Sequence, residues 1–293
     1  MPTYLDLAYI QCRQIARSRA TNFYYAFLTL PKRKRDAIYA TYAFCRICDD
    51  IADGDLTLIE KQSHLSKIRK MLSEGKNNSS KNQIFAALDD TKSFFNIPDH
   101  HFEQVLDGVE MDLTKTRFET FEELRRYCYK VASSVGLISI EIFGYEDPVA
   151  KQYAVDMGLA MQITNILRDL REDAERGRIY IPLDEIASFG YTDQELLAET
   201  VNESFKNLME FQVHRARTYF SRSKKLIPLL TPRSRACFWV LHALYSRILD
   251  RIERAEFDVF SVQIKLSRME KIILMVNLWV ASLLPTGLLQ RRK

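Results

Sequence analysis

Apolar side chains recur at helical spacing through nearly the whole chain, and this periodicity constrains the fold more than any single motif does. The pattern starts near the N-terminus with Tyr4, Leu7, Ile10 and Ile15. No period-2 stretch is long enough to build a sheet, and the sequence shows no repeat or low-complexity tail. Its 9 glycines and 8 prolines are sparse for an all-β protein that needs frequent turns. We therefore predict one all-α domain, a helical bundle over residues 1–293.

Capping and turn residues divide this pattern into helices. Pro31 opens a long helix that stops at Gly54, and Thr120 with Glu123 has the spacing of a capping box. Residues 73–82 form the clearest loop, and Pro182 indicates a short extended segment before it. Further helices are predicted over about 83–95, 98–113, 120–145, 147–177, 193–226, 232–252 and 268–284.

Asp49 and Asp53 stand four residues apart in the stretch FCRICDDIADG, where the apolar neighbours predict the buried side of a helix. Residues at this spacing lie about 40° apart around a helix, so the two carboxylates share a face. Carboxylates placed in this way repel each other and weaken the helix, and burial increases the cost. A bound cation would offset that repulsion.

The same spacing recurs at Asp169 and Asp173 in NILRDLREDAERG, with Glu172 beside them and Asn165 one turn earlier. Mg²⁺ binds one or two carboxylates, keeps several waters and completes its shell with phosphate oxygens. Two acidic helix faces can therefore hold a diphosphate through bridging metal ions. An ordinary solvated acidic face is the alternative, and spacing alone leaves both interpretations open. The solvated face fits the second segment better than the first, because charged residues crowd the second.

Basic residues accompany both acidic segments. Arg46 precedes the first pair, and Arg168, Arg171, Arg176 and Arg178 surround the second. Guanidinium groups bind phosphate in a forked geometry and can stabilise the charge of a departing diphosphate. A surface ion pair with a neighbouring acid is the competing interpretation, and we favour it for Arg171 and Arg176.

Charge and cysteine content narrow the function classes. A formal net charge of +4 against 42 basic and 38 acidic side chains gives no reason to expect nucleic acid as a partner. The 5 cysteines are odd in number. Cys45 and Cys48 have CxxC spacing, but no second pair or histidine completes a zinc site. Buried free thiols suit a reducing cytosol, so we predict a cytoplasmic protein.

Neither end of the sequence predicts a membrane span. Residues 1–13 lack the continuous apolar stretch of a signal peptide. The apolar run at residues 272–285 is interrupted by Asn277 and ends at Pro285, short of the ~20 residues that cross a bilayer. A packed terminal helix is one interpretation. The other is a peripheral helix on the inner face of a membrane, with the basic residues 290–293 at anionic headgroups.

The stretches YAFCRICDDIADG and QITNILRDLREDAERGRIYIP resemble the two signature segments of the squalene/phytoene synthase family. The resemblance covers nearly the whole chain, from NFYYAFLTLP to YSRILDRIE. It implies a helical bundle of the class I isoprenoid synthase type with a central apolar cavity. It also implies a prenyltransferase that joins two prenyl diphosphates head to head and releases diphosphate.

The resemblance assigns roles to individual residues as well. It implies three Mg²⁺ ions between two facing helices, held by Asp49, Asp53, Asp169 and Asp173. One departure is visible, because Asn22 stands where the family usually has Ser. Core packing remains the alternative for the implied tyrosines. The further residues implied for diphosphate, prenyl tails or cation are Asn22, Phe23, Phe27, Tyr42, Arg46, Tyr129, Gln162, Asn165, Arg168, Arg178 and Tyr245.

The implied reaction starts when an allylic donor loses diphosphate to give a carbocation, which aromatic faces stabilise and the double bond of the second substrate captures. Three stretches, NFYYAFLTLP, VASSVGLISIEIFGY and DVFSVQIKLS, are similar to bacterial presqualene diphosphate synthases of the hopanoid route. The expected substrate is therefore farnesyl diphosphate. Phytoene synthase, which condenses two geranylgeranyl diphosphates towards carotenoids, is the alternative. NADPH is needed only if the product is squalene.

Three other classes compete with this interpretation. A terpene cyclase or chain-elongating prenyltransferase uses similar acidic clusters, but the residue order in the two segments favours head-to-head coupling. A di-iron bundle needs Glu-x-x-His pairs, which the 5 histidines do not supply. A non-catalytic assembly factor of the same fold is expected to lose metal-binding acids, whereas all the paired aspartates are present.

Overall fold

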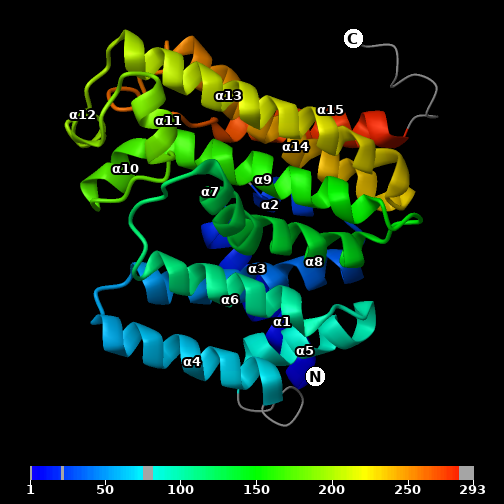
Figure 1. Ribbon diagram of the computed structural model, residues 1–293. Coiled ribbons are helices and arrows are strands. Elements are labelled where there is room, and N and C mark those ends of the chain that lie inside the picture. Colours follow the sequence, from blue (N-terminus) through cyan, green and yellow to red (C-terminus); the bar gives the residue numbers. More distant parts are fainter. Residues whose placement is uncertain (1, 21–22, 75–81, 284–293) are drawn as a thin grey trace.

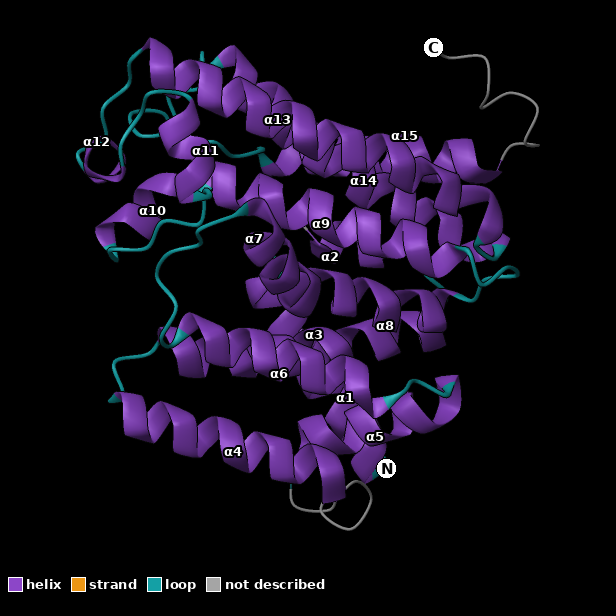
Figure 2. Cartoon of the chain, viewed as in Figure 1, coloured by secondary structure: helices purple, strands orange, loops and turns teal. Residues whose placement is uncertain are grey.

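The computed structural model describes residues 2–20, 23–74 and 82–283, which form a bundle of α-helices (Figures 1 and 2). Extended pairing among these residues is limited to two isolated bridges, one between Arg117 and Ile179 and one between Tyr145 and Leu230. One continuous apolar core connects the helices. The all-α prediction is confirmed.

The helices are numbered in chain order. The elements are α1 (Tyr4–Arg19), α2 (Phe23–Phe27), α3 (Lys32–Asp53), α4 (Leu58–Glu74), α5 (Gln83–Phe95), α6 (Asp99–Asp112), α7 (Phe121–Cys128), the π-helical turn η3 (Tyr129–Ser133), α8 (Ser134–Phe143), α9 (Ala150–Arg168), α10 (Leu170–Glu175), α11 (Leu183–Ser188), α12 (Asp193–Leu197), α13 (Glu203–Ser223), the 3₁₀ turn η4 (Lys224–Leu229), α14 (Pro232–Arg254) and α15 (Arg268–Leu283).

Helix α3 runs through the middle of the bundle, between α1 and α5 on one side and α6 and α8 on the other (Figure 1). Pro31 precedes it and the N–H of Gly54 donates to the carbonyl of Asp50 at its end (3.1 Å), as the sequence predicts. The ring of Phe44 meets that of Phe102 edge-on, with centroids 5.3 Å apart. Packing on both sides fixes the direction in which the C-terminal turn of α3 points.

Helix α9 lies against α8, η3 and α13, and glycine makes its closest approach possible. A Cβ atom at Gly158 would lie 2.5 Å from the Cα atom of Ser133, and one at Gly136 would lie 2.9 Å from the carbonyl oxygen of Ala154. The Ser133 hydroxyl donates to the carbonyl of Val155 (2.9 Å) and tightens the same contact. The backbones of α9 and the α8 region therefore touch directly.

The single helix predicted over residues 147–177 is wrong, because the structure breaks it at one residue. Helix α9 ends at Arg168, Asp169 leaves helical geometry (φ −102°, ψ 15°), and α10 begins at Leu170. The Asp169 carboxylate turns back to the guanidinium of Arg168 and accepts two hydrogen bonds of 2.6 Å. Asp169 and Asp173 thus belong to a joint between two helices.

The helix predicted over residues 193–226 is also wrong. Helix α12 ends at Leu197, Glu199 adopts a left-handed conformation (φ 55°), and α13 starts only at Glu203. The side chain of Asn202 accepts a hydrogen bond from the N–H of Phe205 (2.9 Å) and caps α13. A side chain that satisfies a free helix N–H favours a new start at this point over continuation.

Thr120 caps α7 by accepting from the N–H of Glu123 (3.4 Å), as predicted. The reciprocal half of the capping box does not form, because the Glu123 carboxylate accepts from Lys115 and from the N–H of Glu119 instead. The helix predicted over 120–145 also contains the π-helical turn η3. Such turns insert one residue into a helix and are frequent at functional sites.

Helix α1 does not bury the large side chains that make its pattern helical. Tyr4, Leu7 and Ile10 are exposed, whereas small residues such as Ala8 and Cys12 are fully buried. Small side chains allow α1 to lie close against α3 and α5, which it contacts along its length. Part of the apolar surface of α1 is therefore on the outside.

Several expectations fall on residues that the structure does not describe. Asn22, most of the predicted loop at 73–82, Leu284 and the basic residues 290–293 lie outside the described ranges, although Ser73 still belongs to α4. Over residues 2–20, 23–74 and 82–283, no helix has both the length and the apolar content that a membrane crossing requires.

Candidate active site

An apolar cavity of about 300 Å³ opens between α2, α3, η3, α8, α9 and α14. Most of the side chains that line it are aliphatic, aromatic or methionine. The predicted central apolar cavity is confirmed. Six of the residues that the sequence singles out line it, namely Phe23, Phe27, Tyr42, Asp49, Gln162 and Asn165.

The cavity is polar at one end and apolar at the other. Asp49 marks the polar end on α3, and Asn165 marks it on α9. Ile38 lies 11 residues before Asp49, which is about 16 Å along the helix axis. Phe143 and Phe238 line the cavity as well. A molecule with a charged head and a long apolar tail matches this gradient.

The first acidic pair lies at the cavity mouth on the last turns of α3. The expectation that Asp49 and Asp53 occupy a buried helix side is wrong, since both are accessible. Protein atoms crowd the Asp49 carboxylate and reduce its hydration although the residue is exposed, and this desolvation, followed by repulsion from Asp53 and Asp112, raises the pKa of Asp49 to about 7. Arg46 opposes the shift. Arg46 compensates only in part, because its ion pair is with Asp50 rather than with Asp49.

In the second acidic pair, the pKa of Asp173 is also raised. Desolvation comes first and repulsion from Asp169 second, and together they raise the pKa of Asp173 to about 7 against the opposing charges of Arg178 and Arg176. Asp169 differs, because the Arg168 guanidinium holds it with two hydrogen bonds of 2.6 Å. Burial opposes the charge of Arg168, but these bonds raise its pKa overall.

Arginines from the second segment reach the first and show that the two segments face each other. Nη1 of Arg176 lies 3.3 Å from Oδ1 of Asp53, and Nη1 of Arg178 lies 3.8 Å from the same oxygen. Arg176 was expected to pair with acids of its own segment, so its contact across the gap differs from that interpretation. Arg171 has a structural contact instead, because it donates a hydrogen bond to the carbonyl of Phe260 (2.9 Å).

Aromatic rings cluster beside the cavity around Phe23 of α2. The centroid of its ring lies 6.1 Å from that of Phe27, 6.3 Å from that of Tyr42 and 5.9 Å from that of Tyr245. Burial raises the pKa of Tyr42 to about 12 and also raises the pKa of Tyr245. Both tyrosines are therefore neutral at physiological pH and present uncharged rings.

Tyr129 and Arg46 do not line the cavity, whereas Gln162 and Asn165 do. Tyr129 begins the η3 turn, and the Ser134 hydroxyl donates to its carbonyl (3.1 Å). Arg46 binds the carboxylate of Asp50, while its Nε atom is buried without a hydrogen-bond partner among the described residues. The amide of Asn165 donates to Gln162 (3.3 Å), and its Oδ1 atom is likewise buried without a partner.

The oxygen donors at the mouth fit a hard divalent cation. Neither Asp49 nor Asp173 has a side-chain hydrogen bond or ion pair with a described residue, and both have raised pKa values. Oδ1 of Asn165 adds a buried, unpartnered oxygen. In the described part of the chain, no three His, Cys, Asp or Glu residues form a complete metal site by themselves. Such incomplete sites suit Mg²⁺, whose shell retains water and takes phosphate oxygens.

Sequence reasoning missed Asp112, the last residue of α6. Its carboxylate accepts hydrogen bonds from the hydroxyls of Tyr127 and Tyr180, both at 2.9 Å. Burial raises the pKa of Asp112, while both tyrosine hydrogen bonds oppose that shift. The only available signal was an acid in the apolar stretch GVEMDL, at the end of a predicted helix.

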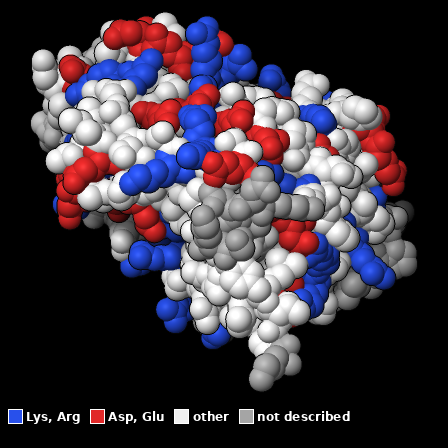
Figure 3. All heavy atoms as spheres, turned by 90° about the horizontal axis from the view of Figure 1, so that it is seen from below, with Lys and Arg blue, Asp and Glu red and all other residues white. Residues whose placement is uncertain are grey.

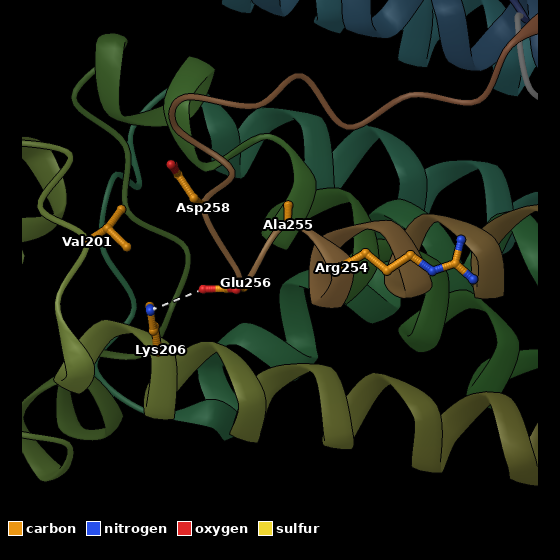
Figure 4. Close-up of a pocket in the computed structure, with 6 residues that line it drawn as sticks. All are labelled: Val201, Lys206, Arg254, Ala255, Glu256 and Asp258. Carbon is orange, nitrogen blue, oxygen red and sulfur yellow. Dashed lines mark ion pairs between the residues drawn. The ribbon is translucent and has the colours of Figure 1, made fainter.

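A second hollow lies where the end of α14 meets the start of α13 (Figure 4). It contains none of the residues that the sequence singles out. Its Lys206 and Glu256 pair with each other at 3.7 Å, and Glu256 has a left-handed backbone (φ 50°). The hollow is polar and lacks the apolar depth of the first cavity.

Comparison with known proteins gives one consistent family. The family model for squalene/phytoene synthase matches residues 16–270. A phytoene synthase from Arthrospira platensis is 38% identical over 270 residues, which cover 87% of this chain and 86% of the relative. A 15-cis-phytoene synthase from Synechococcus elongatus is 37% identical over 268 residues, which cover 87% of each chain.

Solved structures show the same similarity in three dimensions. A dehydrosqualene synthase in complex with a ligand superposes with a TM-score of 0.87 at 29% identity, over 94% of this chain and 97% of the other. A squalene synthase from Alicyclobacillus acidocaldarius superposes with a TM-score of 0.82 at 27% identity, over 88% and 97% of the two chains.

Proposed function

The chain belongs to the squalene/phytoene synthase family of prenyltransferases, and from this premise we propose that it joins two prenyl diphosphates head to head. One observation carries the proposal beyond family membership. Two acidic segments and their arginines face each other at the mouth of a long apolar cavity. This arrangement suits a substrate with a diphosphate head and a prenyl tail.

Diphosphate binding falls to the residues at the mouth. Asp49, Asp53, Asp169 and Asp173 would hold Mg²⁺, which supplies Lewis-acid stabilisation of the departing diphosphate when it is bound. Arg178 and Arg46 add fixed positive charge, and the buried Nε of Arg46 is a donor still available to a phosphate oxygen. These residues favour the charge distribution that develops as the allylic C–O bond breaks.

The aromatic cluster accounts for the fate of the carbocation. The rings of Phe23, Tyr42 and Tyr245 offer negative π-faces that stabilise a cation without bonding to it. The high pKa of Tyr42 keeps its hydroxyl from acting as an anionic nucleophile. The apolar walls exclude water, so the double bond of the second prenyl diphosphate can capture the cation, and loss of a proton then closes the ring of a cyclopropyl diphosphate.

For the tail length, we propose geranylgeranyl diphosphate, which would make the chain a phytoene synthase. The curated relatives from two cyanobacteria, with 38% and 37% identity, support this substrate. Farnesyl diphosphate, with presqualene diphosphate as the product, is the second candidate. The similarity to the dehydrosqualene and squalene synthase structures, at 29% and 27% identity, favours it. Conversion onward to squalene would need NADPH.

A direct assay tests the reaction. The purified protein is incubated with Mg²⁺ and either farnesyl or geranylgeranyl diphosphate, with and without NADPH, and the products are identified by mass spectrometry. We expect phytoene from the twenty-carbon substrate. Presqualene diphosphate or squalene from the fifteen-carbon substrate alone would replace the first candidate by the second. No coupled product from either substrate would refute the proposal.

The same assay addresses a non-catalytic role as an assembly factor. All the paired aspartates are present, and two of them carry the raised pKa values expected where a cation is to be bound. Release of diphosphate that depends on Mg²⁺ and on a prenyl diphosphate supports catalysis. Binding of a prenyl diphosphate without any turnover would support the assembly role.

We also propose a peripheral position at the inner face of a membrane, through α15. Met269, Ile273, Val276, Trp279 and Val280 lie on one face of this helix and are between 42% and 64% exposed. Arg268 and Lys265 add exposed positive charge near its start. An apolar stripe flanked by cations suits an anionic lipid surface.

On the face shown in Figure 3, acidic and basic side chains are interspersed, without the continuous basic area that nucleic acid needs.

Vesicle flotation tests this position. We expect the protein to float with vesicles that contain phosphatidylglycerol, and the variant Ile273→Glu to stay in the soluble fraction. Ile10→Glu is the matched control, because Ile10 is exposed on the apolar face of α1. If both variants or neither lose flotation, α15 is not the contact.

A further inference from the structure

Asp112 lies beside both acidic segments, yet its surroundings differ from theirs. Its negative charge contributes to the raised pKa values of Asp49 and Asp173, which places it within electrostatic range of each segment. Both of its carboxylate oxygens are occupied, Oδ2 by the hydroxyl of Tyr127 and Oδ1 by that of Tyr180. These two hydrogen bonds connect the end of α6 with α7 and with the segment after α10.

One partner of Asp112, Tyr127, lies on α7, and the other, Tyr180, lies in the chain segment that follows α10. Tyr180 is buried, and its ring packs against those of Phe118 and Tyr127, with centroid distances of 5.7 Å and 5.3 Å. The N–H of Ile179 donates to the carbonyl of Thr116 (2.9 Å) in the isolated bridge beside it. Residues 178–180 are therefore fastened to the end of α6 and to the strand-like segment after it.

This attachment fixes the position of Arg178. Its Nη2 atom donates to the backbone carbonyl of Asp112 (3.2 Å), at the C-terminus of α6, where carbonyls lack helical donors and the helix dipole favours a cation. Its Nη1 atom lies 3.8 Å from Oδ1 of Asp53 on α3. One guanidinium thus connects the end of α6 with the first acidic segment.

The geometry points to Asp112 as a positioning residue that holds Arg178 opposite Asp53 and so sets the spacing between the two acidic segments. The Asp112 carboxylate fixes Tyr180, two residues beyond Arg178, and attracts the Arg178 guanidinium. The inference rests on the proposed function, because the spacing matters only if the two segments bind one Mg²⁺-diphosphate group together.

Isothermal titration calorimetry with inorganic pyrophosphate in saturating Mg²⁺ measures this role without turnover. For Asp112→Asn, which keeps the size of the side chain, we expect Kd to rise about tenfold, a typical effect for a residue that orients a ligand-binding group. Tyr180→Phe removes one hydrogen bond but keeps the ring stack, so its effect should be smaller and in the same direction. Asp107→Asn is the matched control on α6, since Asp107 binds Arg69 and Lys130 instead.

A double-mutant cycle shows whether Asp112 acts through Arg178. Arg178→Lys should also raise Kd about tenfold, and Asp112→Asn combined with Arg178→Lys should bind no more weakly than Arg178→Lys alone. If the two effects multiply, or if Asp112→Asn leaves Kd unchanged, the inference is overturned. A lower binding stoichiometry with unchanged Kd would indicate a purely structural role and would overturn it as well. If the unaltered protein does not bind Mg²⁺-pyrophosphate, the proposed function fails first.

Discussion

The two acidic segments have the same spacing of aspartates but use them in opposite order. On α3, Asp49 has no ion pair with a described residue, while Asp53 faces Arg176 and Arg178. At the α9–α10 joint, the first aspartate, Asp169, is held by an arginine, and the second, Asp173, has no ion pair with a described residue. Each segment therefore contributes one carboxylate already paired with arginine and one whose pKa is raised by desolvation and by repulsion from other carboxylates.

The backbones differ as well. The first pair lies on an uninterrupted helix that is packed on several sides, whereas the second pair spans a break in helical geometry at Asp169. Equal spacing in sequence thus does not mean equal local structure. The site therefore combines a half on one continuous helix with a half whose position depends on the arginines and on the attachment of residues 178–180.

Loss of any one of the paired aspartates should reduce activity the most. Asp49→Asn, Asp53→Asn, Asp169→Asn and Asp173→Asn should each lower kcat by about 10³-fold or more, because each removes a proposed metal ligand. Circular dichroism should show unchanged helicity. Asp55→Asn is the control, since Asp55 is exposed beyond the end of α3. Full activity in any of the four would remove that residue from the metal site.

Substitutions of the arginines should have smaller effects, which differ between the two acidic segments. Arg168 holds Asp169 with a bidentate fork, which lysine cannot reproduce, so Arg168→Lys should lower kcat/KM by about 10–100-fold. Arg46 makes one hydrogen bond, to Asp50, and Arg46→Lys should cost less. Steady-state kinetics with a prenyl diphosphate measure both. Equal losses would mean that the fork at Asp169 has no special role.

Protein stability without Mg²⁺ distinguishes the two kinds of aspartate. Asp49 has a folded-state pKa of about 7, above its unfolded value of about 3.8, so its contribution to stability is complete below the unfolded value and is lost as the pH rises through about 7. Asp49→Asn should therefore gain in Tm over the unaltered protein between pH 5 and pH 8, by about 2–4 °C for each kcal/mol recovered.

Asp173→Asn should behave in the same way, because the pKa of Asp173 is also about 7. Asp169→Asn should not, since it breaks the Arg168 pair instead. Thermal scans at both pH values in the presence of a chelator check the difference. An identical Tm response in all three variants would show that the aspartates are equivalent.

The smallest expected effect concerns the end of the second segment. Gly177 follows α10 with φ 69°, and a Cβ atom there would meet nothing within 4 Å, so only backbone strain opposes a side chain. Gly177→Ala should destabilise the protein by about 1 kcal/mol, and Gly177→Asn by less, because asparagine tolerates left-handed geometry. Denaturant unfolding measures both. A larger loss in Gly177→Asn would argue against strain as the cause.

Much of the fold follows from local signals. The boundaries of α3 and α6 agree with Pro31, Gly54 and Pro98, because proline and glycine act on the backbone directly. The breaks at Asp169 and Asn202 were missed, since each depends on a side chain that bonds to a neighbour and so competes with helix continuation. The π-helical turn at Tyr129–Ser133 was also missed, because it gives no distinct periodicity.

The site divides in the same way. The paired aspartates and the aromatic residues could be found from spacing and from the family resemblance. Asp112 could not, because its role comes from two tyrosines that lie 15 and 68 residues away in the chain. The exposed position of Asp49 and Asp53 also differed from the expectation, since their apolar neighbours pack on other faces of the same helix.

The amino-acid sequence is sufficient to show that the chain is helical, that two acidic segments share one spacing, and that the chain resembles one family. Each of these depends on the order of residues along the chain. The tertiary structure is needed to show which aspartates pair with arginine, which remain available to a cation, and how Arg178 contacts Asp53. These outcomes depend on contacts between residues far apart in the chain, and such contacts are set by the packing of whole helices.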